Sequence, residues 1–157
     1  MTKFYDYALG IITLGYFFFN RNPSANIPIG DIIVSPASGT IIDIRGNTID
    51  IFINIWDVHF QRSPSEGIIS NIISQSPMYN IIEMESQMGH VTIERSSGEL
   101  AKTITTFIKV GDYVKKGDTI GRILLGSHTS ITIPPHLSIK VILGQHVSAG
   151  ETILAIQ

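Results

Sequence analysis

Three short segments of the chain contain residues whose types could do chemistry together. Residues 56–67 (WDVHFQRSPSEG) contain His59, residues 35–39 (SPASG) lie near the start, and Gly126 precedes Ser127 late in the chain. A serine hydroxyl is a weak nucleophile until a base takes its proton. An imidazole, with an ordinary pKa near 6.5, suits that role around neutral pH. A serine and a histidine such as His59 could therefore act together as nucleophile and base, but a histidine considered on its own is more often structural.

Composition excludes several other kinds of site. The sequence has no cysteine, so disulfide scaffolds, thiolate zinc sites and a cysteine nucleophile are ruled out. Its five histidines are scattered without an H-x-H or H-x-x-x-H spacing, so no dedicated metal site is predicted. The formal net charge is −2, which lacks the strongly basic character of a nucleic-acid-binding surface.

In their order and separation, the three segments resemble the phosphatidylserine decarboxylase family in its short, pyruvoyl-dependent proenzyme form. That family shows S-P-A-D-G early, D-V-H-x-N-R-x-P-x-x-G in the middle and G-x-I-x-x-G-S late, and the likeness runs from about Asp31 to the C-terminus. The resemblance implies that the Ser127 hydroxyl attacks the Gly126 carbonyl, with His59 as the base. The chain then breaks between Gly126 and Ser127, and Ser127 becomes a pyruvoyl group.

The same resemblance implies an activity and its partners. The reaction would be decarboxylation of phosphatidylserine to phosphatidylethanolamine in phospholipid biosynthesis, with the pyruvoyl ketone as the electron sink. The partners would be a phospholipid substrate and a membrane, and the two fragments would remain together as a heterodimer. We predict substrate contacts for Trp56, Phe60 and Arg62. The alternatives are a core position for Trp56 and, for Arg62, a role in holding the turn at Glu66.

One position departs from the family pattern in a way that bears on catalysis. Ser38 stands where the family has the aspartate of S-P-A-D-G, which orients the histidine as in a serine triad. A serine hydroxyl hydrogen-bonds to a histidine but cannot stabilise an imidazolium by charge. The candidates to supply that charge are Asp43, Asp57 and Glu66. The alternative function is therefore a catalytically impaired relative that binds lipid or a protein partner, and a carrier-like β module is a weaker third option.

The N-terminal segment, residues 1–24, is predicted to associate with a membrane. Residues 7–19 (YALGIITLGYFFF) form an uncharged run of about 13 residues, shorter than the roughly 20 that a spanning helix needs. Its aromatic end is typical of residues that lie at headgroup level, which predicts a peripheral or N-terminally anchored protein. The alternative is a helix buried against the rest of the protein.

The elements that must position the candidate site are predicted to be short strands. Isoleucine dominates the aliphatic residues, residues 48–55 alternate between apolar and polar side chains, and no long helical period follows Pro23. Residues 110–120 and 143–153 share the pattern G-[DQ]-x-V-x-x-G-[DE]-T-I, which resembles the hairpin unit of lipoyl- and biotinyl-carrier domains. We therefore predict a mainly β catalytic domain over residues 25–157, a compact β-sandwich or barrel with lipoyl-like hairpin repeats, preceded by a short apolar helix.

Overall fold

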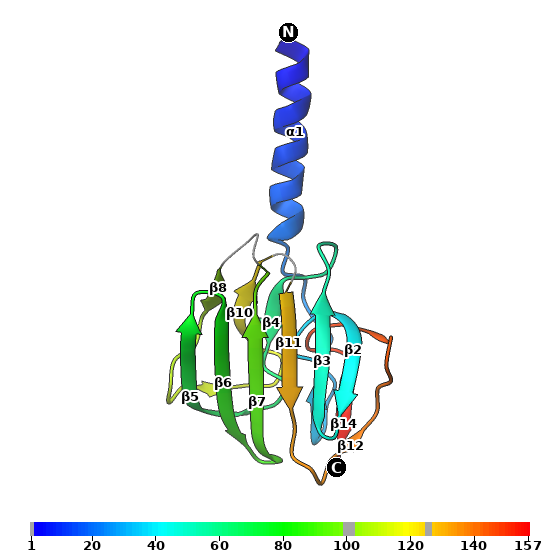
Figure 1. Ribbon diagram of the computed structural model, residues 1–157, viewed down its shortest axis with the longest axis vertical. Coiled ribbons are helices and arrows are strands. Elements are labelled where there is room, and N and C mark those ends of the chain that lie inside the picture. Colours follow the sequence, from blue (N-terminus) through cyan, green and yellow to red (C-terminus); the bar gives the residue numbers. More distant parts are fainter. Residues whose placement is uncertain (1, 99–102, 125–126) are drawn as a thin grey trace.

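The computed structural model describes residues 2–98, 103–124 and 127–157, which form one helix and three β-sheets (Figure 1). The helix is α1 (Thr2–Phe19). The large sheet has eight strands in the order β13 (His146–Val147), β2 (Gly39–Arg45), β3 (Thr48–Ile53), β11 (Ser127–Thr132), β7 (Gly89–Ser96), β6 (Tyr79–Ser86), β5 (Gly67–Ser76) and β9 (Tyr113–Val114). One small sheet has the order β1 (Ile32–Val34), β14 (Ile153–Ile156) and β12 (Ser138–Ile139). The other has the order β4 (Phe60–Arg62), β10 (Thr119–Ile123) and β8 (Ile104–Thr106).

The core of the β domain lies between the large sheet and the two small sheets. Alternate residues of β3, β7 and β11 are buried, as expected of strands with one face toward a core. The buried side chains are mainly β-branched, and Ile51, Ile93 and Ile131 are fully excluded from solvent. The predicted mainly β class and sandwich architecture are confirmed, and the sheets pack face to face instead of closing into a barrel.

The two copies of the predicted repeat occupy equivalent places at opposite edges of the large sheet. The first copy contributes edge strand β9 and leads into β10, and the second contributes edge strand β13 and leads into β14. β10 and β14 are each the middle strand of a small sheet. The turns of both copies contain glycines with positive φ, such as Gly117 at 86° and Gly150 at 78°. The repeat seen in the sequence is therefore a structural repeat.

A second pair of matching segments extends this symmetry. Residues 35–39 (SPASG) and residues 63–67 (SPSEG) each connect a short strand to a long one. The residue before each segment bonds to the proline of the other: the Val34 N–H donates to the Pro64 carbonyl, and the Arg62 N–H donates to the Pro36 carbonyl. Their last glycines approach a neighbouring strand too closely for a side chain, because a Cβ at Gly39 would lie 2.2 Å from the Phe52 carbonyl oxygen. Gly67 is placed in the same way against the carbonyl of Glu85. The domain thus has two similar halves.

Helix α1 extends away from one end of the β domain (Figure 1). Leu14 and Phe17 are 72% and 67% exposed, so the helix does not lie buried against the domain as the alternative interpretation required. Among the described residues, no helix combines the length and apolarity needed to cross a bilayer. The linker after the helix is tied down, since the Arg62 guanidinium donates to the Pro23 carbonyl at 2.7 Å and the Asn26 N–H donates to Glu151 at 2.8 Å.

Candidate active site

The carboxyl end of β10 brings together the two segments that carry His59 and Ser127. The Ile123 N–H, at the end of β10, donates to the His59 carbonyl at 3.1 Å. His59 is the residue before the first residue of β4. The Ser127 hydroxyl donates to the Leu124 carbonyl at 3.3 Å, where β11 begins. Segments almost seventy positions apart in the sequence therefore meet at the same end of one strand.

The side chains of these two residues lie on the interior of the sandwich. His59 and Gln61 are both buried while Phe60 between them is only half-buried, so His59 and Gln61 point to the same side. On β11, Ser127 and Thr129 are fully buried. The Gln61 amide donates to the Thr129 hydroxyl at 2.5 Å across the space between the sheets. His59 lies two residues before Gln61, and Ser127 lies two residues before Thr129. Since side chains two apart in a strand share a face, both point into the space between the sheets.

The environment of the His59 ring favours its neutral form. Burial lowers the pKa of His59 below 6.5, and the positive charges of Arg21 and Arg122 act in the same direction against the opposing effect of Asp57. The ring packs against Phe19 with a centroid separation of 5.3 Å. Neither ring nitrogen makes a hydrogen bond of normal geometry with any described residue. A neutral imidazole with a free nitrogen is able to take up a proton.

The Ser127 side chain is the candidate nucleophile of the site. Its side chain is fully buried, and its only hydrogen bond within the described part of the chain is the one to Leu124, which leaves the oxygen lone pairs free. Gly126, the predicted partner in the cleaved bond, lies outside the described residues.

Ser38 makes a different contact from the one predicted for it. Its hydroxyl accepts a hydrogen bond from the Ala149 N–H at 3.0 Å, and within the described residues it makes none to His59. Ser38 lines a cavity of about 180 Å³ together with Val58 and Arg62. The described structure therefore gives Ser38 a role in holding the turn of the second repeat and no orienting bond to the histidine.

Of the three acidic residues considered for the missing charge, Asp57 is the one that acts on His59. Its negative charge raises the pKa of His59, although burial prevails. Its carboxylate is held in place by the Asn54 N–H at 2.8 Å and by the His146 ring nitrogen at 2.9 Å. Asp43 instead pairs with Arg45 at 3.0 Å, and Glu66 accepts a long hydrogen bond of 3.5 Å from the Tyr113 hydroxyl.

The three predicted substrate contacts have different surroundings. Trp56 is 69% exposed, so it is not a core residue, and its ring lies beside Phe18 near the base of α1. Phe60 packs against Phe107 at the same end of the domain. Arg62 donates to the Gly117 carbonyl, the Asn22 side chain and the Pro23 carbonyl, so it fastens the linker and not the turn at Glu66.

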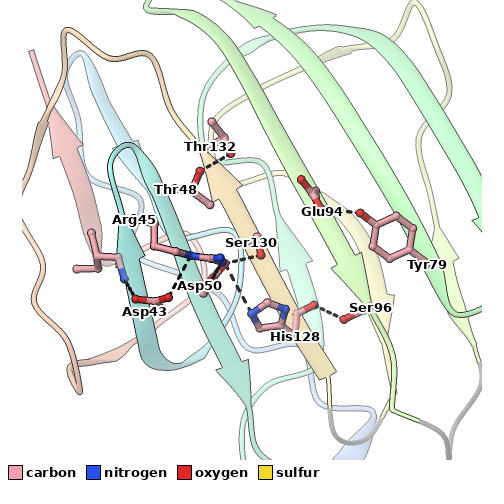
Figure 2. A network of polar contacts seen from close by, with 11 residues as sticks. Asp43, Arg45, Thr48, Asp50, Tyr79, Glu94, Ser96, His128, Ser130 and Thr132 are labelled. Atoms are coloured by element: carbon pink, nitrogen blue, oxygen red, sulfur yellow. Dashed lines mark hydrogen bonds and ion pairs between the residues drawn. The ribbon is translucent and has the colours of Figure 1, made fainter.

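His128, directly after Ser127, lies on the outer face of the large sheet. Its side chain is 36% exposed, and its Nε2 is 3.7 Å from the Asp50 carboxylate. Figure 2 shows that His128 points toward Asp50, which also accepts a hydrogen bond from Ser130 at 2.5 Å and pairs with Arg45. Because neighbouring strand residues point to opposite faces, His128 is directed away from the face that carries the Ser127 side chain.

One buried charge near the site was missed at the level of sequence. Arg95 is fully buried on β7, and burial lowers its pKa to about 10. Its guanidinium donates to the Asn80 side chain at 2.6 and 3.0 Å, to Thr106 at 2.5 Å and, more weakly, to Gln61 at 3.4 Å. None of these acceptors is charged. The available signal was the alternation Val91, Ile93, Arg95, which puts an arginine at an inward-facing position.

Comparisons with known proteins show the family to which the chain belongs. The sequence model of the family described as phosphatidylserine decarboxylase matches residues 75–155. A phosphatidylserine decarboxylase proenzyme of Solibacter usitatus is 30% identical over 169 residues, covering 95% of this chain and 83% of that protein. The chain belongs to the phosphatidylserine decarboxylase family. A relative from Methanosarcina barkeri, named "Putative archaetidylserine decarboxylase proenzyme", is 35% identical, covering 87% of this chain and 74% of its own length.

Membership of the phosphatidylserine decarboxylase family gives the geometry a chemical context. The relatives are named as proenzymes of decarboxylases that differ in the lipid they act on. Carbon dioxide is lost from an α-amino acid only when an electron sink accepts the electron pair that remains. Among the described residues, no group of histidine, aspartate and glutamate side chains is arranged to hold a metal ion.

Proposed function

We propose that this chain is a pyruvoyl-dependent phosphatidylserine decarboxylase that activates itself by cleavage between Gly126 and Ser127. The observation that carries the proposal is the meeting of His59 and Ser127 at the carboxyl end of β10, with both side chains buried and the His59 nitrogens free of hydrogen bonds to described residues. Family membership supports the same reaction. The product from phosphatidylserine is phosphatidylethanolamine, as needed in phospholipid biosynthesis.

The cleavage begins at the Ser127 hydroxyl. His59 takes its proton, the serine oxygen bonds to the Gly126 carbonyl carbon, and the carbon–nitrogen bond breaks, so that an ester replaces the amide and the amine nitrogen receives the proton. Loss of the Ser127 α-proton then breaks the bond between Cβ and the ester oxygen, which leaves with Gly126 as a carboxylate. Water hydrolyses the remaining group at residue 127, ammonia departs, and a pyruvoyl group remains at the start of the smaller fragment.

The pyruvoyl ketone supplies the electron sink for decarboxylation. The part of the chain's own residues is to hold and shield the substrate. Burial around Ser127 and the Phe19 ring against His59 exclude water from the reacting end of the lipid. Neutral His59 is able to accept a proton there and to return it afterwards, with the fixed charge of Asp57 nearby in place of the family aspartate at position 38.

A membrane-associated location is part of the proposal. The exposed apolar side chains of α1, and the exposed ring of Trp56 beside its base, suit the headgroup region of a bilayer. Docking by α1 would present the end of the domain that carries His59 to a lipid headgroup. The N-terminal segment 1–24 is therefore assigned to membrane association and residues 25–157 to catalysis.

Intact-mass analysis of the purified full chain tests the self-cleavage. We expect two fragments that separate after Gly126, the smaller one with a blocked, pyruvoyl-bearing start, and carbon dioxide release from phosphatidylserine vesicles. Ser127→Ala should give a single chain without activity. Ser130→Ala, a serine of the same strand on the opposite face, is the matched control and should still be cleaved. A single unmodified chain in the unaltered protein would refute the proposal.

A second function is favoured by one observation, the bond of Ser38 to Ala149 in place of an orienting carboxylate on His59. On this alternative the chain is a catalytically impaired relative that binds lipid. Flotation of the chain with phosphatidylserine vesicles, without fragment formation or carbon dioxide release, would support the alternative against the first proposal.

A further inference from the structure

Two arginines lie at the base of α1, beside the candidate active site. Arg21 follows the helix, and its guanidinium sits 3.7 Å from the centre of the Phe18 ring. It donates to the Phe18 carbonyl at 2.8 Å and to the Trp56 carbonyl. Arg122 comes from β10, where its guanidinium lies 5.8 Å from the centre of the Phe60 ring. Because Arg122 bonds to the side chain of Asn20, the residue before Arg21, the two cations lie at the same end of the domain.

The polar partners of these arginines are all neutral. Arg21 bonds to two main-chain carbonyls, and Arg122 bonds to the side-chain oxygen of Asn20. Neither guanidinium forms an ion pair with a carboxylate in the described ranges 2–98, 103–124 and 127–157. The Nε of Arg122 is buried and has no hydrogen-bond partner among these residues. A buried charged donor without an acceptor is unfavourable, so this position is suited to an anion.

The two arginines also lie close to the reacting residues. Both guanidinium charges lower the pKa of His59, so both lie within electrostatic reach of its ring. Arg122 directly precedes Ile123, whose N–H is bonded to the His59 carbonyl. An anion held by Arg21 and Arg122 would therefore lie next to the site where His59 and Ser127 meet.

The surroundings of the pair match the depth of a lipid phosphate. Trp56 and Phe107 are 69% and 51% exposed at this end of the domain, and Phe17 on the helix is 67% exposed. Aromatic side chains gather where the apolar and polar parts of a bilayer meet. Guanidinium groups bind phosphate through paired hydrogen bonds, which makes arginine well suited to this role.

We infer that Arg21 and Arg122 bind the phosphodiester of the phospholipid substrate and so direct its amino-acid end toward Ser127. This inference rests on the proposed function, because it assigns the lipid-phosphate contact of that same site. It also reassigns a role first considered for Arg62, which is engaged with the linker.

The test uses the full chain carrying Ser127→Ala, so that neither cleavage nor turnover affects binding. Affinity is measured for short-chain phosphatidylserine and short-chain phosphatidylethanolamine, which share a phosphodiester but differ in the carboxylate. Arg122→Gln and Arg21→Gln should each weaken binding of both lipids by a similar factor, about tenfold for a lost charge-assisted pair of bonds. Lys140→Gln removes an exposed charge after β12 and should change neither affinity. Arg122→Lys keeps the positive charge but lacks the planar guanidinium group with its paired donors. An unchanged melting temperature for this variant would show that the position tolerates substitution.

Three results would overturn the inference. Unchanged affinity for both lipids would mean that the arginines do not bind the headgroup. Weaker binding of phosphatidylserine alone would mean that they bind the carboxylate. The third result has two parts: the starting protein binds inorganic phosphate as tightly as lipid, and the arginine variants lose the same affinity for both. Together these would mean a general anion site. The binding measurements use only the Ser127→Ala chain, which does not cleave itself. Their result is therefore independent of whether the unaltered protein cleaves itself.

Discussion

Replacing the buried guanidinium of Arg95 should cost a large share of the domain's stability. Arg95→Met keeps the volume roughly constant but leaves the oxygens of Asn80 and Thr106, now bonded at 2.5–3.0 Å, without donors. Each buried acceptor left without a donor costs about 1–3 kcal/mol, so the two oxygens together should cost about 3–5 kcal/mol. For a domain of this size, that corresponds to a melting temperature lower by roughly 6–20 °C.

The assay is urea unfolding at equilibrium, in the Ser127→Ala background so that one species is present. Arg45→Met is the control, because that side chain is 67% exposed and the ion pair of an exposed side chain contributes little to stability. The double variant Asn80→Leu with Arg95→Met should recover part of the loss, since it also removes the stranded acceptor. A cost below about 1 kcal/mol for Arg95→Met would refute the reasoning that these bonds hold β7 to β6 and β8.

Three further outcomes concern the site. The pKa of His59 is lowered below 6.5, so the base stays neutral as the pH falls through 6.5. The cleavage rate, measured by mass spectrometry from roughly pH 5 to pH 8, should therefore remain high below pH 6.5 and fall only at the lower pKa of the folded protein. A midpoint above pH 6.5 would contradict this. Ser38→Asp should speed cleavage by restoring the family carboxylate near His59, and an unchanged rate would assign position 38 a structural role only. Gly121→Ala should prevent stable folding, measured by thermal melting, because its Cβ would lie 2.4 Å from the Thr105 carbonyl oxygen.

Local patterns in the sequence were sufficient to predict the β class and the repeat. Alternating isoleucines define strands because side chains of a strand point to opposite faces, and paired glycines define turns because few other residues adopt positive φ. The resemblance to the family brought His59 and Ser127 into one hypothesis before any geometry was available. The structure adds that both lie at the end of β10, which no local pattern could show.

Contacts between distant residues account for what the sequence did not predict. The binding partner of Ser38 is a main-chain N–H more than a hundred positions away, and such a bond leaves no trace in local spacing. Arg62 was predicted to meet a lipid or the turn at Glu66, but it bonds to the linker because the chain after α1 returns across β4. The same folding back places Arg21 beside Arg122, and neither had been singled out.

The internal symmetry explains why one half of the domain carries the proposed chemistry. The two halves have the same main-chain connections, since the Gly117 N–H donates to the Ser63 carbonyl as the Gly150 N–H donates to the Ser35 carbonyl. In this correspondence, one residue before β4 is His59, whereas one residue before β1 is Asp31. The shared backbone places these two residues alike, but Asp31 is exposed whereas His59 is buried. The histidine is present in only one of them, beside the carboxyl end of β10 and close to the start of β11.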